Sequence, residues 1–132
     1  MPRVLIIDDE EDIRDVLTDV LNRAGFEVEV ASTGDEGIDK LRSKPADMIV
    51  TDIIMPGKDG VATIREIREE FPDAKIIAIS GGGNFGSNDY EPNAIKTTAY
   101  LAAAGEAGAD VILSKPFDRE ALMEAVRTLI AS

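Results

Sequence analysis

The chain has 132 residues, of which 44% are hydrophobic and 30% are charged, a balance typical of one globular domain with a substantial core. Asp and Glu number 26 against 14 Lys and Arg, so the formal net charge is −12, and such a surface should repel nucleic acids and anionic membranes. The sequence has no Cys and no His, which excludes a disulfide framework, thiolate catalysis and imidazole metal ligands.

Membrane and export signals are not recognisable in the sequence. The N-terminal apolar run, Val4 to Ile7, is interrupted by acidic residues and is too short for the core of a signal peptide. No later stretch is apolar for long enough to cross a bilayer. A cytoplasmic protein without membrane insertion is therefore expected.

Two strands and one helix are predicted near the N-terminus. The run at 4–7 is apolar throughout, which is typical of a strand buried on both faces. Apolar residues then recur with helical spacing over 13–21, with Val16 on the apolar face, and Gly25 stands where a glycine commonly ends a helix. Residues 26–30 alternate apolar with acidic residues, which predicts a strand at the edge of a sheet.

The second helix and the third strand follow. Thr33 and Glu36 have the spacing of a capping box, and the short helix that they open should run to about Arg42. The apolar run at 48–50 predicts a third strand, which ends at Asp52. The segment after Asp52 is rich in turn-forming residues.

The second half of the chain continues the same alternation. Helical spacing predicts a helix over 61–71, and the apolar run at 76–79 predicts the fourth strand. An Ala-rich helix is expected over about 91–107, a short fifth strand over 111–113 and a last helix over about 118–130. The apolar face of the last helix should consist of Leu122, Ala125, Val126, Leu129 and Ile130.

Five strands that alternate with five helices predict an α/β fold with a parallel five-stranded sheet and helices on both faces. The apolar first, third and fourth strands should be central and the amphipathic second strand should lie at an edge. A strand order of 2-1-3-4-5 fits, which is the order of a flavodoxin-like, doubly wound (βα)5 sandwich. A single domain over 1–132 is expected, with an extended loop and helix at about 81–107.

Polar residues end each of the central strands. In open α/β sheets, binding sites lie at the carboxyl ends of the strands, near the switch in strand order. Asp8, Asp9 and Asp52 end the two strands at that switch, and Ser80 and Lys115 follow the fourth and fifth strands. One such Asp is often only a helix cap or a turn former. The joint occurrence of all five groups at one edge favours a site.

Three carboxylates close together repel one another and so call for a cation. Mg²⁺ prefers oxygen ligands and often combines one or two carboxylates with waters and a phosphate. One carboxylate could then act as the nucleophile toward a phosphoryl group, as in aspartyl-phosphate chemistry. Ser80 and Lys115 would supply a donor and a positive charge to the phosphoryl oxygens.

Four motifs resemble the receiver domain of two-component response regulators, of the stand-alone, single-domain type. They are V-L-I-I-D-D-E at the first strand, I-V-T-D-I-I-M-P-G-K-D-G at the third, I-S-G at the fourth and L-S-K-P-F after the fifth. The resemblance covers essentially the whole chain. It implies that Asp52 is the phosphoacceptor, and that Asp8 and Asp9 bind Mg²⁺ (or Mn²⁺) together with Asp52 and the backbone carbonyl of Ile54.

The resemblance assigns further roles around the phosphoacceptor. Ser80 would be the hydroxyl that turns toward the phosphoryl group and Lys115 its cationic partner, with the bond before Pro116 in the cis form. Small Gly81 would leave the approach to Ser80 open. These implied roles make the site an electrostatic switch that responds to the new charge on Asp52.

The implied activity is Mg²⁺-dependent transfer of a phosphoryl group onto Asp52, followed by self-dephosphorylation. The chain would thus catalyse only its own modification and would not turn over an external substrate. The donor would be a phosphohistidine on a sensor histidine kinase or a histidine phosphotransfer protein, and the output would be contact with a downstream effector protein. The absence of His excludes this chain as the phosphohistidine donor.

The sequence departs from the family pattern in two places, and two further positions bear on dephosphorylation. Ile112 stands where the family usually has an aromatic residue in the fifth strand, so either Ile112 simply packs there or the output runs through the loop after the fourth strand. That loop is longer than usual, either as a tolerated surface insertion or as a mobile lid or partner-docking segment beside the phosphorylation site. Ile54 and Gly82 offer no polar group to orient the hydrolytic water, which predicts slow dephosphorylation.

Three other functions compete with this interpretation. A haloacid-dehalogenase-type phosphatase needs a second Asp two residues after the nucleophile, and Ile54 stands there instead. A phosphorylation-independent protein-binding module on a receiver scaffold stays open as the alternative. Gly81, Gly83 and Gly86 match a dinucleotide-binding fingerprint, but the breaker-rich run after Gly86 does not continue as the required helix.

Overall fold

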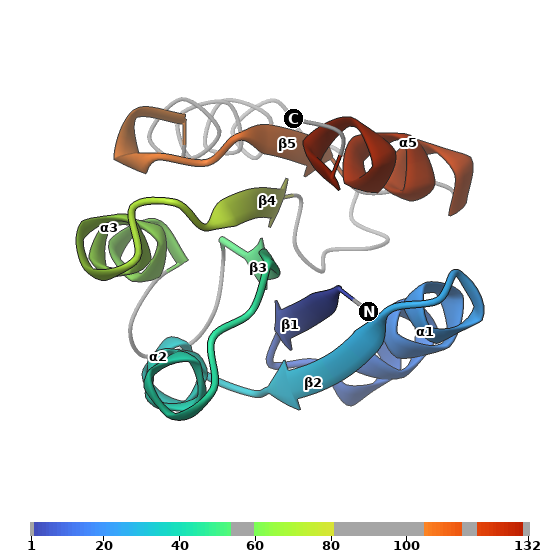
Figure 1. The fold of residues 1–132 in the computed structure, drawn as a ribbon, viewed down its shortest axis with the longest axis horizontal. Coiled ribbons are helices and arrows are strands. Elements are labelled where there is room, and N and C mark those ends of the chain that lie inside the picture. Colours follow the sequence, from blue (N-terminus) through green and yellow to red (C-terminus); the bar gives the residue numbers. More distant parts are fainter. Residues whose placement is uncertain (1, 54–59, 81–104, 115–118, 131–132) are drawn as a thin grey trace, which may run out of the picture.

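The computed structural model describes residues 2–53, 60–80, 105–114 and 119–130, and its fold is shown in Figure 1. The described part contains a five-stranded sheet in which all neighbouring strands are parallel, in the predicted order β2-β1-β3-β4-β5. The strands are β1 (Arg3–Ile7), β2 (Glu27–Ala31), β3 (Met48–Asp52), β4 (Lys75–Ser80) and β5 (Val111–Ser114).

Helices connect the strands and cover both faces of the sheet. Their bounds in the described part are α1 (Glu11–Arg23), α2 (Gly34–Ser43), α3 (Gly60–Glu70) and α5 (Arg119–Ile130). Helices α1 and α5 lie on one face, and α2 and α3 lie on the other (Figure 1). Of the helix predicted over about 91–107, residues 105–107 are helical. The rest of the extended loop and helix expected at about 81–107 lies outside the described residues.

The two faces of the sheet carry separate hydrophobic cores because successive strand residues point to opposite sides. In β1, Val4 and Ile6 pack in the core under α1 and α5, whereas Leu5 and Ile7 pack in the core under α2 and α3. All four side chains are at most 1% exposed. A strand buried on both faces in this way explains the continuous apolar runs of β1, β3 and β4.

The helix ends largely follow the predicted signals. Gly25 has a φ of 97°, the left-handed conformation that favours glycine after a helix. At the start of α2, the Glu36 amide donates to Thr33 Oγ1 at 3.1 Å. The Glu36 carboxylate accepts from the backbone N–H and the hydroxyl of Ser32, each at 2.9 Å, so the reciprocal bond lies one residue earlier than in a standard capping box.

Two residues predicted to lie on apolar helix faces are exposed instead. Val16 is 60% exposed and Ile130 is 43% exposed. Helix α1 docks with Leu17 and Leu21 against the sheet, and each residue turns about 100° from its neighbour, so Val16 leaves the buried row. The assignment of Val16 to the buried face was therefore wrong, and the same holds for Ile130 at the end of α5.

Strand β2 lies at the edge of the sheet, as predicted, but begins one residue later than expected. Phe26 precedes the strand and packs in the core under α1, while its amide donates to the Leu21 carbonyl at 3.0 Å. The strand runs on to Ala31, which is 1% exposed.

Within the described ranges no helix is long and apolar enough to cross a membrane.

Arg68 ties together the segments that enter β4 and β5. Its Nη1 donates to the carbonyls of Pro72 and Ala74 at 2.6 and 2.8 Å. Its Nη2 donates to the Gly108 carbonyl at 2.7 Å and to Asp110 Oδ2 at 2.9 Å. We call this group, Arg68 with its four acceptors, the Arg68 clasp. It holds the segment directly before the edge strand β5, and sequence periodicity did not reveal this contact.

Candidate functional site

Asp8 and Asp52 meet at the carboxyl ends of two neighbouring central strands. Asp8 follows Ile7 at the end of β1, and Asp52 is the last residue of β3. Ile7 pairs with Thr51 in the register of these strands, so each acid is the next residue along. Oxygen atoms of Asp8, Asp9 and Asp52 all lie within 4.8 Å of one another. We call these three residues the acidic cluster.

Two members of the acidic cluster are buried. Asp8 is 1% exposed and Asp52 is 2% exposed, whereas Asp9 is exposed. Two ionised carboxylates at 4.8 Å repel each other by roughly 3.5 kcal/mol at an effective dielectric constant of about 20. Burial and repulsion both disfavour this arrangement of negative charge, and a bound cation would relieve both. The donor set of carboxylate oxygens fits a hard divalent cation such as Mg²⁺.

The loop that carries Asp8 and Asp9 is fixed by hydrogen bonds at both ends. The Asp8 amide donates to the Ala31 carbonyl at 3.0 Å. The Glu10 amide donates to Asp8 Oδ1 at 2.9 Å, which closes a tight turn around Asp9. Arg14 Nη1 donates to the Asp8 carbonyl at 2.7 Å. Sequence reasoning missed Arg14, although its place in the first turn of the predicted helix was a usable signal, since helical side chains point back toward the N-terminus.

The backbone around Asp52 is held by β4 and by the start of α3. The Ile53 amide donates to the Ile79 carbonyl at 3.0 Å, and the Gly60 amide donates to the Ile53 carbonyl at 2.9 Å. A Cβ atom at position 60 would lie 2.3 Å from both the Asp52 carbonyl oxygen and the Ile53 Cα. Only glycine fits this contact, so Gly60 is a second residue near the site that sequence reasoning did not single out.

The other predicted site residues are only partly covered by the structure. Ser80 is the last residue of β4 and pairs with Ser114 of β5. Because Asp52 pairs with Ile79, Ser80 is the next residue along the strand beside the acidic cluster. The structure thus brings the end of β4 to the edge where Asp52 lies. Predicted site residues that lie outside the described residues are Ile54, Gly81, Gly82, Lys115 and Pro116.

Ile112 lies in β5 at a position opposite Ala78 of β4. Its side chain is partly buried and packs against the core under α2 and α3. The Gly105 position approaches it, with a distance of 3.8 Å from the Cδ1 of Ile112 to an ideal Cβ on Gly105. Position 112 is therefore occupied by an aliphatic side chain that takes part in the packing of the sheet.

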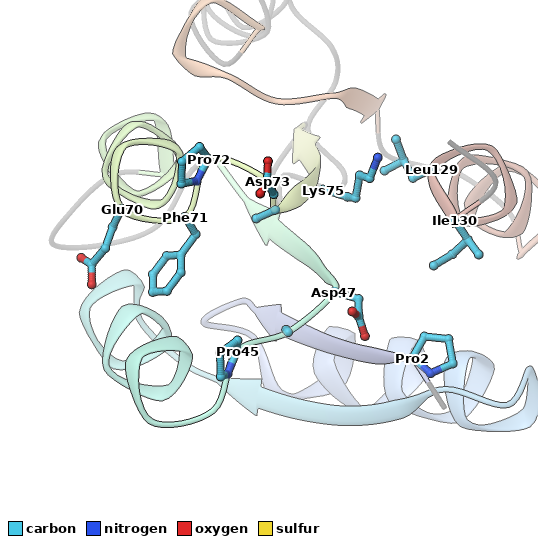
Figure 2. A pocket seen from close by; sticks show the side chains of 12 residues that line it. Pro2, Pro45, Asp47, Glu70, Phe71, Pro72, Asp73, Lys75, Leu129 and Ile130 are labelled. Carbon is cyan, nitrogen blue, oxygen red and sulfur yellow. The ribbon is translucent and has the colours of Figure 1, made fainter.

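A pocket of about 800 Å³ lies at the amino ends of the strands, opposite the end that carries the acidic cluster. Figure 2 shows the side chains that line it. Its lining includes Pro2 before β1, Asp47 before β3 and Lys75 at the start of β4. Leu129 and Ile130 of α5 complete one side of it. This cavity contains no part of the acidic cluster, so chemistry is expected at the carboxyl edge and not here.

Comparisons with known proteins agree with this geometry. The family model of the response regulator receiver domain matches residues 4–127. The chemotaxis protein CheY of Thermotoga maritima is 34% identical over 125 residues, which are 94% of this chain and 93% of that protein. The response regulator MprA of Mycolicibacterium vanbaalenii is 31% identical over 97% of this chain, which spans 50% of that relative.

Solved structures with the same fold include chemotaxis response regulators. The chemotaxis protein CheY4 of Vibrio cholerae matches with a TM-score of 0.80 and 26% identity, and the alignment covers 98% of each chain. A response regulator from Chloroflexus aurantiacus matches with a TM-score of 0.82 and 26% identity, covering 99% of this chain and 98% of that one. The chain therefore belongs to the response regulator receiver domain family, the phosphoacceptor domains of two-component signalling.

Proposed function

We propose that Asp52 is the residue that accepts the phosphoryl group. The observation that carries this proposal is the acidic cluster itself, with Asp52 at the end of β3 and within 4.8 Å of the oxygens of Asp8 and Asp9. Asp52 is 2% exposed, and its backbone is held by β4 and α3. A rigid, buried carboxylate beside two further acids suits a nucleophile that works with a cation.

The residues that would hold Mg²⁺, or Mn²⁺, are Asp8, Asp9, Asp52 and the backbone carbonyl of Ile54. When bound, the cation would neutralise the acidic cluster and stabilise negative charge on the phosphoryl oxygens. The described carboxylates support this role by their chemistry and their mutual distances. Family membership supports it as well, since this fold recurs in a family of phosphoacceptor domains.

In the proposed step a carboxylate oxygen of Asp52 attacks the phosphorus atom of a phosphohistidine. The P–N bond of the donor breaks, its electron pair stays on the imidazole nitrogen, and an acyl phosphate forms on Asp52. The Ser80 hydroxyl would donate to a phosphoryl oxygen, and the Lys115 ammonium would pair with its charge. Pro116 would set the approach of Lys115, and Gly81 would leave room beside Ser80.

Water would reset the switch by attacking phosphorus and breaking its bond to the Asp52 oxygen, which returns the carboxylate and inorganic phosphate. Ile54 and Gly82 place no polar side chain two residues after Asp52 and Ser80. No such group would orient the hydrolytic water, so the phosphoryl group should persist for minutes or longer. A lifetime of seconds in Mg²⁺ buffer would contradict this part of the proposal.

Membership of the family implies a histidine kinase on the input side and an effector protein on the output side. We propose that the direct donor is a sensor histidine kinase or a histidine phosphotransfer protein, and that phosphorylation changes affinity for the effector. The change would begin with the negative charge added at Asp52 and with the movement of Ser80 and Lys115 toward it.

The test is incubation with acetyl phosphate and Mg²⁺, followed by intact mass measurement. The wild-type chain should gain one phosphate, and Asp52→Ala should gain none. Asp47→Ala is the matched control, because Asp47 precedes the same strand at its opposite end. It should be phosphorylated like the wild type. The absence of an adduct from all small phosphodonors would favour a phosphorylation-independent binding module instead.

A further inference from the structure

Arg14 closes the loop between β1 and α1 that carries two members of the acidic cluster. Its side chain donates from Nη1 to the Asp8 carbonyl at 2.7 Å. Its own amide donates to the Glu10 carbonyl at 3.1 Å as α1 begins. One residue therefore binds both the first and the third residue of the segment Asp8–Glu10, and Asp9 lies between them.

This closure matters because Asp9 has little else to hold it. Asp9 is exposed, and no donor among the described residues bonds to its carboxylate. The side chain of Glu10 does not cap α1 by a hydrogen bond either. The position of the Asp9 carboxylate thus depends on the shape of the loop backbone, and that shape depends on the bonds at Asp8 and Glu10.

The Arg14 bond also leaves the chemistry of the acidic cluster available. Arg14 is half-buried, and its bond goes to a backbone carbonyl. A carboxylate–arginine pair would occupy the oxygens that a cation needs. A bond to the carbonyl holds the loop without using those oxygens. This is the kind of outer support that commonly orients the ligands of a metal site.

We propose that Arg14 is a positioning residue for the cation site, which holds Asp8 and Asp9 at the spacing that the cation requires. The inference rests on the proposed function, in that the acidic cluster is taken to bind Mg²⁺. It adds a residue of α1, outside the cluster and touching neither the cation nor the phosphoryl group. It also predicts that replacing Arg14 weakens cation binding, whereas the loss of its positive charge alone would strengthen it.

The sign of that effect separates the two explanations. Removing a positive charge beside three carboxylates should tighten cation binding if Arg14 acts only through its charge. Removing a support of the loop should weaken binding, because losing an outer-shell partner commonly lowers metal affinity by about 10-fold to 100-fold. A positioning role therefore predicts weaker binding in spite of the lost positive charge.

The experiment measures Mn²⁺ binding by counting free Mn²⁺ with electron paramagnetic resonance, followed by displacement with Mg²⁺. Arg14→Met should weaken Mn²⁺ binding about tenfold relative to the wild type. Arg23→Met is the matched control, because it removes the same charge from the same helix at a side chain paired with Asp19 at 3.1 Å. The control should bind Mn²⁺ as tightly as the wild type or slightly more tightly.

A conservative variant and a metal-free measurement complete the design. Arg14→Lys keeps the charge and a donor, so its affinity should lie between those of the wild type and Arg14→Met. In metal-free protein the amide of Glu10 should exchange with solvent faster in Arg14→Met than in Arg23→Met. If Arg14→Met is poorly folded, the Lys variant and its amide exchange carry the same comparison.

Two results have different meanings. If Arg14→Met binds Mn²⁺ as tightly as Arg23→Met, the positioning role is wrong even though the site binds metal. Where Arg14→Met is poorly folded, the same comparison is made with Arg14→Lys. If the wild type itself binds neither Mn²⁺ nor Mg²⁺, the proposed metal site fails instead. An intermediate affinity for Arg14→Lys together with fast Glu10 exchange in Arg14→Met supports the inference.

Discussion

Acidic residues have opposite surroundings at the two ends of the parallel strands, which we call the carboxyl edge and the amino edge of the sheet. At the carboxyl edge, the three residues of the acidic cluster gather within 4.8 Å of one another. At the amino edge, acids are matched with arginines: Arg3 pairs with Glu27 at 3.0 Å and also with Glu29, and Arg68 pairs with Asp110 at 2.9 Å. Pairs of arginine and carboxylate stabilise the fold. Three carboxylates placed together destabilise it, but they form a site that suits a cation.

The amino edge also uses its acids as backbone acceptors. Asp47 Oδ2 accepts from the Arg3 amide at 2.8 Å before β3 begins. Asp110 Oδ2 accepts from the Ile76 amide at 2.8 Å, and the Asp110 amide donates to the Ile76 carbonyl at 2.8 Å. Asp110 thereby sets the register in which Val111 pairs with Ile77. Aspartates occur at both ends of the strands, so residue type alone does not separate structural from functional carboxylates. The groups that each carboxylate contacts do separate them.

The largest expected effect is the loss of the Arg68 clasp. Arg68→Met should lower the free energy of unfolding by about 2 to 3 kcal/mol, because one charged side chain serves four acceptors. Urea unfolding would measure the loss. Arg42→Met is the matched control, since Arg42 pairs with Glu70 at 2.8 Å on the exposed surface, where solvent screens the interaction. Equal decreases in the free energy of unfolding of the two variants would show that the Arg68 clasp stabilises the fold no more than an exposed ion pair does.

A smaller effect is expected at the acidic cluster, and with the opposite sign. In metal-free protein Asp8→Asn should raise the free energy of unfolding by about 1 kcal/mol, because it removes one of two buried like charges. It should also abolish the stabilisation by Mg²⁺, which for the wild type is about 1.4 kcal/mol at ten times the dissociation constant. Thermal unfolding with and without Mg²⁺ measures both quantities.

Asp47→Asn provides the contrast from the other edge of the sheet. It should lower the stability of metal-free protein slightly, because a neutral amide oxygen accepts from the Arg3 amide less strongly than the Asp47 carboxylate does. It should keep the full Mg²⁺ response. The comparison between the two edges would break down if Asp8→Asn and Asp47→Asn destabilised the metal-free protein equally.

The smallest effect concerns pH and the first turn of α2. Hydrogen bonds from the backbone and hydroxyl of Ser32 hold the pKa of Glu36 below the ordinary value of 4.5, and Lys40 lowers that pKa further. A depressed pKa contributes stability above the unfolded-state pKa, and this contribution is lost as pH falls through the folded-state pKa. Glu36→Gln should therefore be less stable than the wild type at neutral pH, and the difference should shrink below about pH 4.5.

Urea midpoints measured from neutral pH down to about pH 3 would show this convergence. The effect should be small because the Glu36 side chain is 42% exposed, so solvent screens much of the interaction. A difference between Glu36→Gln and the wild type that stays constant with pH would mean that charge on Glu36 does not stabilise α2.

The sheet could be predicted from sequence because each central strand is buried on both faces and reads as an apolar run. Helix α1 shows where periodicity stops being informative. Val16 fits the apolar pattern as well as Leu17 does, yet only Leu17 is buried. The docking angle of a helix depends on the shape of the sheet beneath it, which a one-dimensional pattern does not contain.

The candidate site could be predicted in part for a similar reason. Parallel strands deliver the residues at their carboxyl ends to one edge, so the meeting of Asp8, Asp9 and Asp52 follows from topology. Arg14 and Gly60 were missed because their roles are contacts with backbone atoms. A bond to a carbonyl, or the absence of a side chain beside one, leaves no motif of complementary residue types in the sequence.

The contact of Arg14 with a carbonyl has a practical consequence for experiments on this domain. A bond to the backbone does not depend on which side chain stands at position 8. Asp8→Asn and Asp9→Asn should therefore change the charge of the loop while its path is preserved. The charge of the site can therefore be changed separately at positions 8 and 9. Metal affinity and the rate of phosphoryl transfer can then be measured as a function of charge while the loop backbone keeps its path.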